Sequence, residues 1–215
     1  VRGTITSETW ETLNATFLEA RSHHRGLSEA ARGEFLEWVK YRSLLTRAVI
    51  MGTMLRDEAY HFFCIGTFLE HADHTTRLLE ARWRDPGRSG ERLIAEAAEW
   101  SVLLRAMSAF EVYRRVYREA VTPQRVTELL LLKEEMPQSV HRCLSNLRLN
   151  LAAVANHQSG ETQRRAGELH AQFRFGRFEE LCAEGVTAFL DRFQSRLRDL
   201  GARIARDFLV PLEAQ

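Results

Sequence analysis

The residues best suited to chemistry lie in one segment, residues 54–82, which reads MLRDEAYHFFCIGTFLEHADHTTRLLEAR. Residues 60–69 in its middle are apolar almost all round, which is typical of a helix buried inside a bundle. The segment nevertheless carries many ionisable side chains: Arg56, Asp57, Glu58, His61, Glu70, His71, Asp73, His74 and Arg77. Because an unpaired buried charge costs several kcal/mol, these groups must find partners. We therefore expect a polar network along one long, central and buried helix.

A helical wheel places Glu70, Asp73 and Arg77 on one stripe, together with Gly66. The small residue predicts the close approach of another helix. Arg77 follows Asp73 by four positions and Glu70 by seven, so its guanidinium can reach back towards both carboxylates. Two interpretations remain open for this stripe. It is either an ion-pair network that fixes helix register or a binding site for an anionic or peptidic ligand.

Glu58 and His61 fall on the apolar face of the same helix and are expected to be buried. Their spacing is the one that ferritin-like bundles use to place a carboxylate and an imidazole on a metal. Such a site needs a second Glu-x-x-His, which the chain does not contain, so a hydrogen-bonded core histidine is favoured over a mononuclear metal site. His71 and His74 are also three residues apart. They point towards the polar side, which favours a solvated or inter-helix face over a ligand cluster.

No nucleophile with an adjacent base is visible in the sequence. Cys64, Cys143 and Cys182 are widely spaced in apolar helical contexts, which favours free thiols in a reducing, cytoplasmic compartment over disulfides or zinc. Ser139 follows Pro137 at a helix start, where serine caps more often than it attacks. The free N–H groups of that helix start make Ser139 a candidate contact for an anion. We expect no catalytic residue, metal or cofactor.

The composition of the 215 residues, 45% hydrophobic and 27% charged, predicts a soluble globular protein with a sizeable core. The net charge of +1 provides no field to attract nucleic acid, so we expect no nucleic-acid partner. No window approaches 18 uncharged apolar residues, which argues against a membrane partner.

The elements that position these residues are all predicted to be helices, because strand signals are almost absent. Apolar periodicity, caps and breakers predict an all-α, up-and-down bundle. The expected helices span residues 7–23, 29–50, 54–82, 91–120, 123–135, 137 to about 159, and 161–209. Ser7, Ser28 and Thr122 are the expected caps of the first, second and fifth helices. The expected breaks are at Gly26, at Gly52 and Thr53, at the turn Asp85-Pro86-Gly87 and, within the last helix, at Gly176, and Pro211 ends that helix.

Several stretches resemble the Alpha-E family, a bacterial helical domain of unknown function with a Glu-Arg motif. The resemblance is carried by SETWETLN (residues 7–14), GTMLRDEAYHF (52–62), FLEHADHTTRLLEAR (68–82) and MPQSVHRCL (136–144), with GVTAFLDRF (185–193) as a weaker addition. These stretches span nearly the whole chain in the order of the family. The resemblance implies a single domain over residues 1–215, corresponding to roughly the C-terminal two thirds of the family domain.

Two departures from the family pattern remove a guanidinium. The chain has Glu70-His71 where the family usually has Glu-Arg, and Pro137-Gln138-Ser139 where it usually has Pro-Arg-Ser. If those arginines hold an anion in relatives, this chain should hold it more weakly or hold something else.

The genes of the family accompany those of ATP-grasp ligases and transglutaminase-like proteins. The resemblance therefore implies that the chain acts together with such proteins in peptide synthesis, modification or turnover. We expect an accessory domain that binds such a partner or presents a peptide. This role is favoured over that of an enzyme. The binding surface is predicted to include Arg56, Asp57, Glu58, Glu70, His71, Asp73, Arg77 and Ser139. Other partners that remain open are a separate chain carrying the family's N-terminal segment and a second copy. The alternative function is an enzyme, possibly metal-dependent, with its active site in the Glu/His/Asp/Arg network.

Overall fold

The computed structural model describes residues 4–22, 29–84 and 92–209, and every regular element among them is helical. The all-α prediction is therefore confirmed. In chain order the elements are α1 (Ser7–Ser22), α2 (Glu29–Thr53), α3 (Glu58–Arg84), α4 (Arg92–Ala106), α5 (Phe110–Tyr117), α6 (Pro123–Leu132), α7 (Val140–Ala153), α8 (Gly160–Phe175), α9 (Phe178–Leu181), α10 (Val186–Ile204) and the π-helical turn η1 (Ala205–Leu209).

The chain divides into two compact units, residues 1–63 and 64–215, and the division falls inside α3. The expectation of a single domain over residues 1–215 stays a prediction. In the first unit α1 and α2 pair as a helical hairpin. Arg42 of α2 ties them together, because its guanidinium donates to the Thr16 hydroxyl at 2.8 Å and to the Thr12 carbonyl at 3.1 Å. The first helix is capped by Thr6, whose hydroxyl accepts from the Thr9 N–H, and not by Ser7 as predicted.

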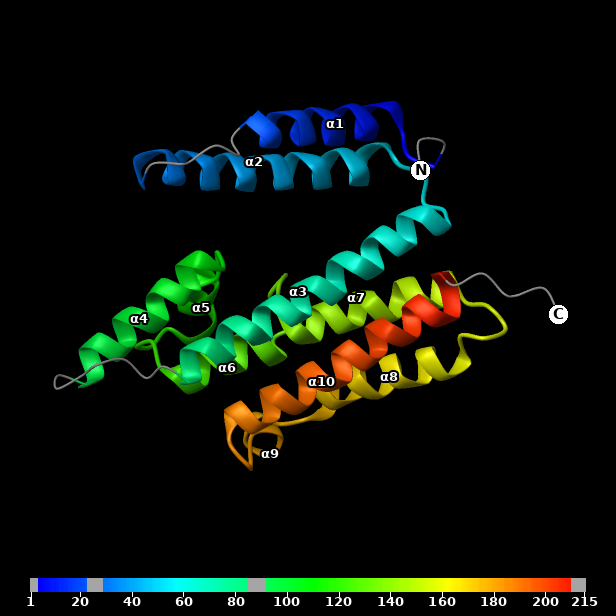
Figure 1. Cartoon of the computed structure of the whole chain (residues 1–215). Helices are drawn as coiled ribbons and strands as arrows, with labels where there is room; N and C mark the ends of the chain where they lie inside the picture. The colour runs from blue at the N-terminus through cyan, green and yellow to red at the C-terminus, as the bar shows by residue number, and fades with distance from the viewer. Residues whose placement is uncertain (1–3, 23–28, 85–91, 210–215) are drawn as a thin grey trace. The chain divides into compact units, whose positions relative to one another are not determined.

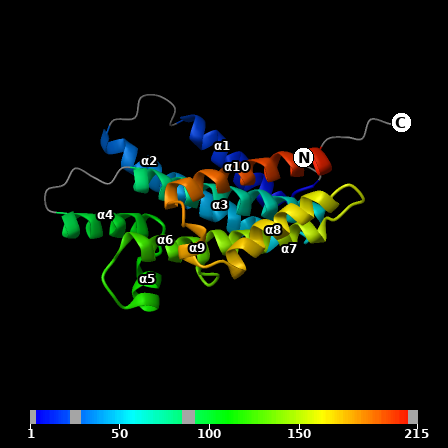
Figure 2. The same cartoon turned by 90° about the horizontal axis from the view of Figure 1, so that it is seen from below.

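The second unit is built around helices that run along a common direction, namely α3 from residue 64 onward, α7, α8 and α10 (Figures 1 and 2). Helices α7 and α8 form an antiparallel pair, and α10 returns along α8. The shorter helices α4, α5 and α6 pack on one another beside this bundle. Short connections favour such antiparallel neighbours, so the up-and-down prediction describes this unit well.

The core of the second unit is filled largely by the apolar faces of α7 and α10. Leu144, Leu147 and Leu151 of α7 are almost fully buried. An aromatic cluster joins α8 to α10, since the Phe173 ring lies edge-on to Phe193 with centroids 5.0 Å apart. The Phe189 ring stacks on Phe193, lies tilted against Phe173 and completes the cluster. Aromatic side chains bury the largest apolar areas, so this cluster fixes the α8–α10 contact.

The long helix α3 begins four residues later than predicted. Asp57 caps it, because its carboxylate accepts from the Tyr60 N–H at 3.3 Å. Cys64 and Ile65 are buried, whereas Gly66 is exposed. The helix that was predicted to be buried is therefore not covered on every side.

The single helix predicted for residues 91–120 is broken in the structure. Ser108 adopts a left-handed backbone with φ of 53° between α4 and α5. Its neighbours Met107 and Ala109 are both buried. The bend lets both apolar side chains enter the core, although no glycine or proline marks it in the sequence.

Two further boundaries differ from the predictions. Helix α7 begins at Val140 rather than at Pro137, and Ser139 is its N-cap. At Gly176, which ends α8, a Cβ would lie 2.3 Å from the Gln172 carbonyl oxygen, so only glycine fits there. The predicted break at Gly176 is confirmed, but it extends through the short α9 to Gly185.

Some predicted features lie outside the described residues. These are the break at Gly26, the cap at Ser28, the turn at Asp85-Pro86-Gly87 and the helix end at Pro211.

Candidate functional site

A small pocket lies between α3 and α10 and has a volume of about 160 Å³. Helix α3 contributes Glu70, Asp73 and Arg77, which the sequence placed on one stripe. Successive positions three and four apart face the same way on a helix, so these side chains meet around one opening. Their partner helix, which the sequence did not identify, is α10. The pocket is completed by Leu69, Leu197, Arg198 and Gly201.

The charged rim of this pocket contains one direct ion pair. Arg77 Nε lies 2.6 Å from Asp73 Oδ2, and the two side chains are 62% and 28% exposed. Glu70 lines the same pocket and is exposed. Within the described part of the chain, Arg77 pairs with Asp73 and not with Glu70, so the predicted bridge to both carboxylates is only half realised. Glu70 and the exposed Arg198 of α10 therefore remain available to a ligand or partner.

The floor of the pocket is apolar and tightly packed. Leu197 is almost fully buried, and Leu69 meets α10 at Gly201. A Cβ added at position 201 would lie 3.2 Å from Leu69 Cδ2. Close approach therefore occurs at a glycine of α10. Gly66 was predicted to allow it, but a Cβ there would meet nothing within 4 Å, so that prediction is wrong.

His71 and His74 of α3 have different surroundings. His71 is half-buried, and the Phe68 ring lies edge-on to it with centroids 6.5 Å apart. His74 is exposed. Neither side chain lines the pocket formed by Glu70, Asp73 and Arg77. His71 stays a predicted binding residue with a visible packing role.

The predicted site residues of the first unit lie at the start of α3. Asp57 is the helix cap described above, and the Arg56 guanidinium lies 6.0 Å from the centre of the Tyr60 ring. Glu58 is exposed and His61 is half-buried, so the prediction that both are buried is wrong. Glu58 is the first residue of the helix, where an acidic side chain is stabilised in solvent by the helix dipole.

Ser139 acts as a helix cap in the structure. Its hydroxyl accepts from the Arg142 N–H at 3.1 Å, and its side chain is fully buried. The adjoining Gln138 carbonyl accepts from the Thr75 hydroxyl of α3 at 3.0 Å. This helix start is therefore packed against α3. A ligand role for Ser139 stays a prediction.

The three cysteines are free thiols, as the sequence predicted. Cys64 and Cys143 are buried, and Cys182 is half-buried. Burial, with a contribution from Glu179, raises the pKa of the Cys182 thiol to about 11. Thiolate is the nucleophilic form, so Cys182 is a poor nucleophile at neutral pH.

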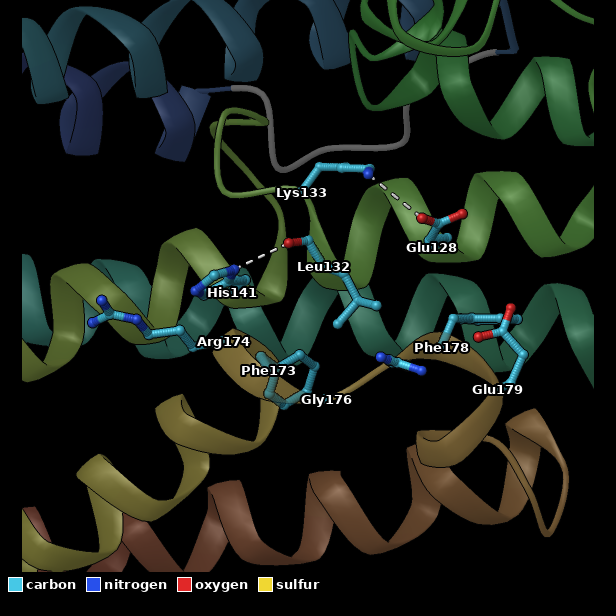
Figure 3. A pocket seen from close by; sticks show the side chains of 10 residues that line it. Glu128, Leu132, Lys133, His141, Phe173, Arg174, Gly176, Phe178 and Glu179 are labelled. Carbon is cyan, nitrogen blue, oxygen red and sulfur yellow. Dashed lines mark hydrogen bonds and ion pairs between the residues drawn. The ribbon is translucent and has the colours of Figure 1, made fainter.

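A second, larger cavity lies in the same unit and was missed by the sequence reasoning (Figure 3). It is formed by the ends of α6 and α8, the start of α7 and the short α9. One signal pointed to it, the alternation of phenylalanine and arginine in FRFGRF, residues 173–178. The remaining lining residues come from positions that are distant in sequence, so periodicity could not bring them together.

The described residues contain neither a metal-binding cluster nor a membrane-spanning helix. Three or more His, Cys, Asp or Glu side chains placed to hold a metal ion are not found among residues 4–22, 29–84 and 92–209. Within the same residues, none of the helices has the length and apolar character needed to cross a membrane.

Comparison with known proteins identifies the family. No curated protein and no solved structure matches the chain. Residues 1–209 match the Alpha-E family, which is described as a predicted alpha-helical domain with a conserved ER motif. The match covers nearly all of the 215 residues, including the α3 and α10 residues of the small pocket. The chain belongs to the Alpha-E family.

Proposed function

We propose that this chain is an accessory binding domain that works with an ATP-grasp ligase or a transglutaminase-like protein in peptide synthesis, modification or turnover. Its contribution is to hold that partner, or a peptide substrate, at the pocket between α3 and α10. The observation that carries the proposal is the meeting of Glu70, Asp73 and Arg77 with Arg198 around an apolar floor. The expected partners follow from the family resemblance, and the free thiols fit a cytoplasmic location.

The chemistry of the pocket favours recognition. Its rim carries two carboxylates and two guanidiniums, and its floor is formed by leucines and a glycine. Charged groups around a small apolar patch resemble the rim and centre of a protein interface. The seven lining residues include no hydroxyl, thiol or imidazole, the groups that most often serve as nucleophile or general base. The pocket therefore suits docking better than covalent chemistry.

The test is direct binding of the purified chain to each candidate partner from the same genome, measured by titration calorimetry. Asp73→Asn combined with Arg77→Gln is expected to weaken binding at least tenfold at low salt, because charges at an interface rim steer association and their loss slows it. The matched control is Arg164→Gln with Glu168→Gln, which removes another exposed ion pair, four residues apart, from α8. The control should bind like the unmodified chain.

Two results would overturn the proposal. The first is the absence of binding to either class of partner. The second is unchanged affinity in the Asp73 and Arg77 variant, provided that the thermal unfolding of both variants matches that of the unmodified chain.

A further inference from the structure

The pocket between α3 and α10 has room for one side chain. Its volume of about 160 Å³ is close to the volume of about 150 Å³ at which an apolar cavity holds benzene. Pockets that enclose a cofactor or a drug-sized molecule measure about 300–1,000 Å³. The pocket is therefore filled by one group between a leucine and a phenylalanine side chain in size, and a whole cofactor does not fit.

The floor of the pocket offers only apolar surface. It is formed by the side chains of Leu69 and Leu197 and by Gly201, which has no side chain. A polar group that entered would give up its hydration without gaining a hydrogen bond from these side chains. The group that occupies the floor is therefore apolar.

Two of the four charges at the rim are free. Arg77 Nε lies 2.6 Å from Asp73 Oδ2, so these two side chains neutralise each other. Glu70 and Arg198 are exposed, and neither has a hydrogen bond or an ion pair with any residue that the structure describes. The rim therefore presents one unpaired carboxylate and one unpaired guanidinium.

These two free charges come from opposite walls of the pocket. Helices α3 and α10 run antiparallel (Figure 1), and Leu69 contacts Gly201 where they meet. Glu70 of α3 lies next to this contact, whereas Arg198 of α10 lies three residues, about 4.5 Å of helix, away from it. A group seated on the floor therefore has a carboxylate on one side and a guanidinium on the other.

This distribution of charge disfavours ligands of a single sign. A dianion such as phosphate would meet the carboxylates of Glu70 and Asp73, and a dication would meet Arg77 and Arg198. Like charges placed opposite each other across an interface are unfavourable, whereas complementary charges steer and orient a partner. A segment with one cationic and one anionic side chain matches both free groups.

We propose that the pocket holds one apolar side chain of a peptide segment, of leucine to phenylalanine size, and binds one cationic and one anionic side chain next to it. Glu70 binds the cationic side chain, and Arg198 binds the anionic one. The Asp73–Arg77 pair lines the pocket and contributes no free charge. This inference rests on the proposed function, because it names what the pocket recognises in a partner protein or a peptide substrate.

The probes are three capped pentapeptides, acetyl-Ala-Arg-Leu-Glu-Ala-amide and its counterparts with Glu-Leu-Glu and Arg-Leu-Arg at the centre. NMR shifts of the Gly201 amide in the full chain follow their weak binding. At low salt the mixed-charge peptide is expected to bind at least about threefold more tightly than either peptide of a single sign, which is the effect that an exposed ion pair provides.

Charge reversal in the protein tests the assignment of each wall. Glu70→Lys should make the Glu-Leu-Glu peptide the tightest ligand, and Arg198→Glu should do the same for the Arg-Leu-Arg peptide. Both side chains are exposed, so neither change disturbs the core. The controls Glu168→Lys on α8 and Arg192→Glu on α10 make the same changes outside the pocket and should leave the preference for the mixed-charge peptide unchanged.

Exchange of the central leucine of the mixed-charge peptide tests the apolar anchor. Alanine at this position should weaken binding about tenfold, because it leaves the apolar floor uncovered. Phenylalanine should bind like leucine, and tryptophan should bind more weakly, because its side chain exceeds the pocket.

Several results would overturn this inference: no shift with any peptide, equal affinity for all three, an unchanged preference in Glu70→Lys and Arg198→Glu, or alanine as tight as leucine. If a whole partner nevertheless binds in calorimetry and loses affinity in the Asp73 and Arg77 variant, the proposed function stands and only the recognised segment is wrongly assigned. Selective binding of the peptides without binding to either class of partner would overturn the proposed function instead.

Discussion

Leu69 of α3 and Gly201 of α10 lie in close contact, and a Cβ on residue 201 would come within 3.2 Å of Leu69 Cδ2. The absence of a side chain at Gly201 lets the two helices meet there. Asp73 and Arg77 follow one and two turns further along α3 and face the same opening. The small pocket therefore owes its position to one glycine of a helix far away in the sequence.

The contact at Gly201 predicts sensitivity to added volume. Gly201→Val should lower the free energy of unfolding by about 1–3 kcal/mol, because overpacking a tight contact forces the neighbouring side chains to shift. The matched control is Gly167→Ala on α8, where a Cβ meets nothing within 4 Å. That change should raise stability by about 0.5–1 kcal/mol through helix propensity. Urea unfolding measures the free energy of unfolding of both variants. An undiminished value for Gly201→Val would show that the Leu69 side chain can move aside without cost.

The Asp73–Arg77 pair is predicted to matter little for stability. The arginine side chain is 62% exposed, and exposed pairs one helical turn apart contribute about 0.5 kcal/mol or less. A double-mutant cycle with Asp73→Asn and Arg77→Met should give a coupling within that limit. A coupling energy above about 1.5 kcal/mol, well beyond the range for exposed pairs, would favour the register-fixing role over binding.

The cap at Ser139 is predicted to stabilise α7. Ser139→Ala should cost about 1 kcal/mol, because the Arg142 N–H loses its acceptor at a fully buried helix start. Thr122→Ala at α6 should cost less, since its acceptor distance to the Arg125 N–H is 3.4 Å rather than 3.1 Å. Thermal unfolding of both variants checks the order, and the reverse order would contradict it.

The neighbouring imidazoles of His141 and His170 predict a pH dependence. Their ring centres lie 5.4 Å apart. Burial lowers the pKa of His170, with further lowering by His141, Arg148 and Arg174, against a smaller opposing effect of Glu134. The folded protein therefore resists protonation of His170, whereas the unfolded chain takes up the proton near its ordinary pKa of about 6.5.

The contribution of His170 to stability is thus fully present above about pH 6.5, the ordinary histidine pKa, and is lost as the pH falls below it. His170→Gln should flatten the loss of unfolding free energy between neutral and mildly acidic pH. The control His157→Gln removes an exposed imidazole and should leave the slope as it is. Denaturant unfolding across this range measures the slope, and an identical slope in His170→Gln would refute the assignment.

Local signals in the sequence were sufficient for most of the helices. The Thr122-Pro123 pair starts α6 as predicted, because a hydroxyl acceptor followed by proline suits a first turn. Local signals failed at Ser108, where the apolar period continues through a bend that only the burial of Met107 and Ala109 explains. They also failed at Glu58, which was predicted to be buried and is exposed. A helical wheel assigns a residue to a face of the helix, but it cannot tell at which residue other helices begin to cover that face.

The sequence by itself determined the all-α class, the family and the stripe of Glu70, Asp73 and Arg77, since these depend on neighbours within one or two helical turns. The tertiary structure alone decided which helix the stripe meets, because close approach depends on Gly201 and not on Gly66. It also brought His141 to the Lys133 and Arg177 cavity. Such convergence depends on how helices pack, and periodicity along one helix carries no information about its partner.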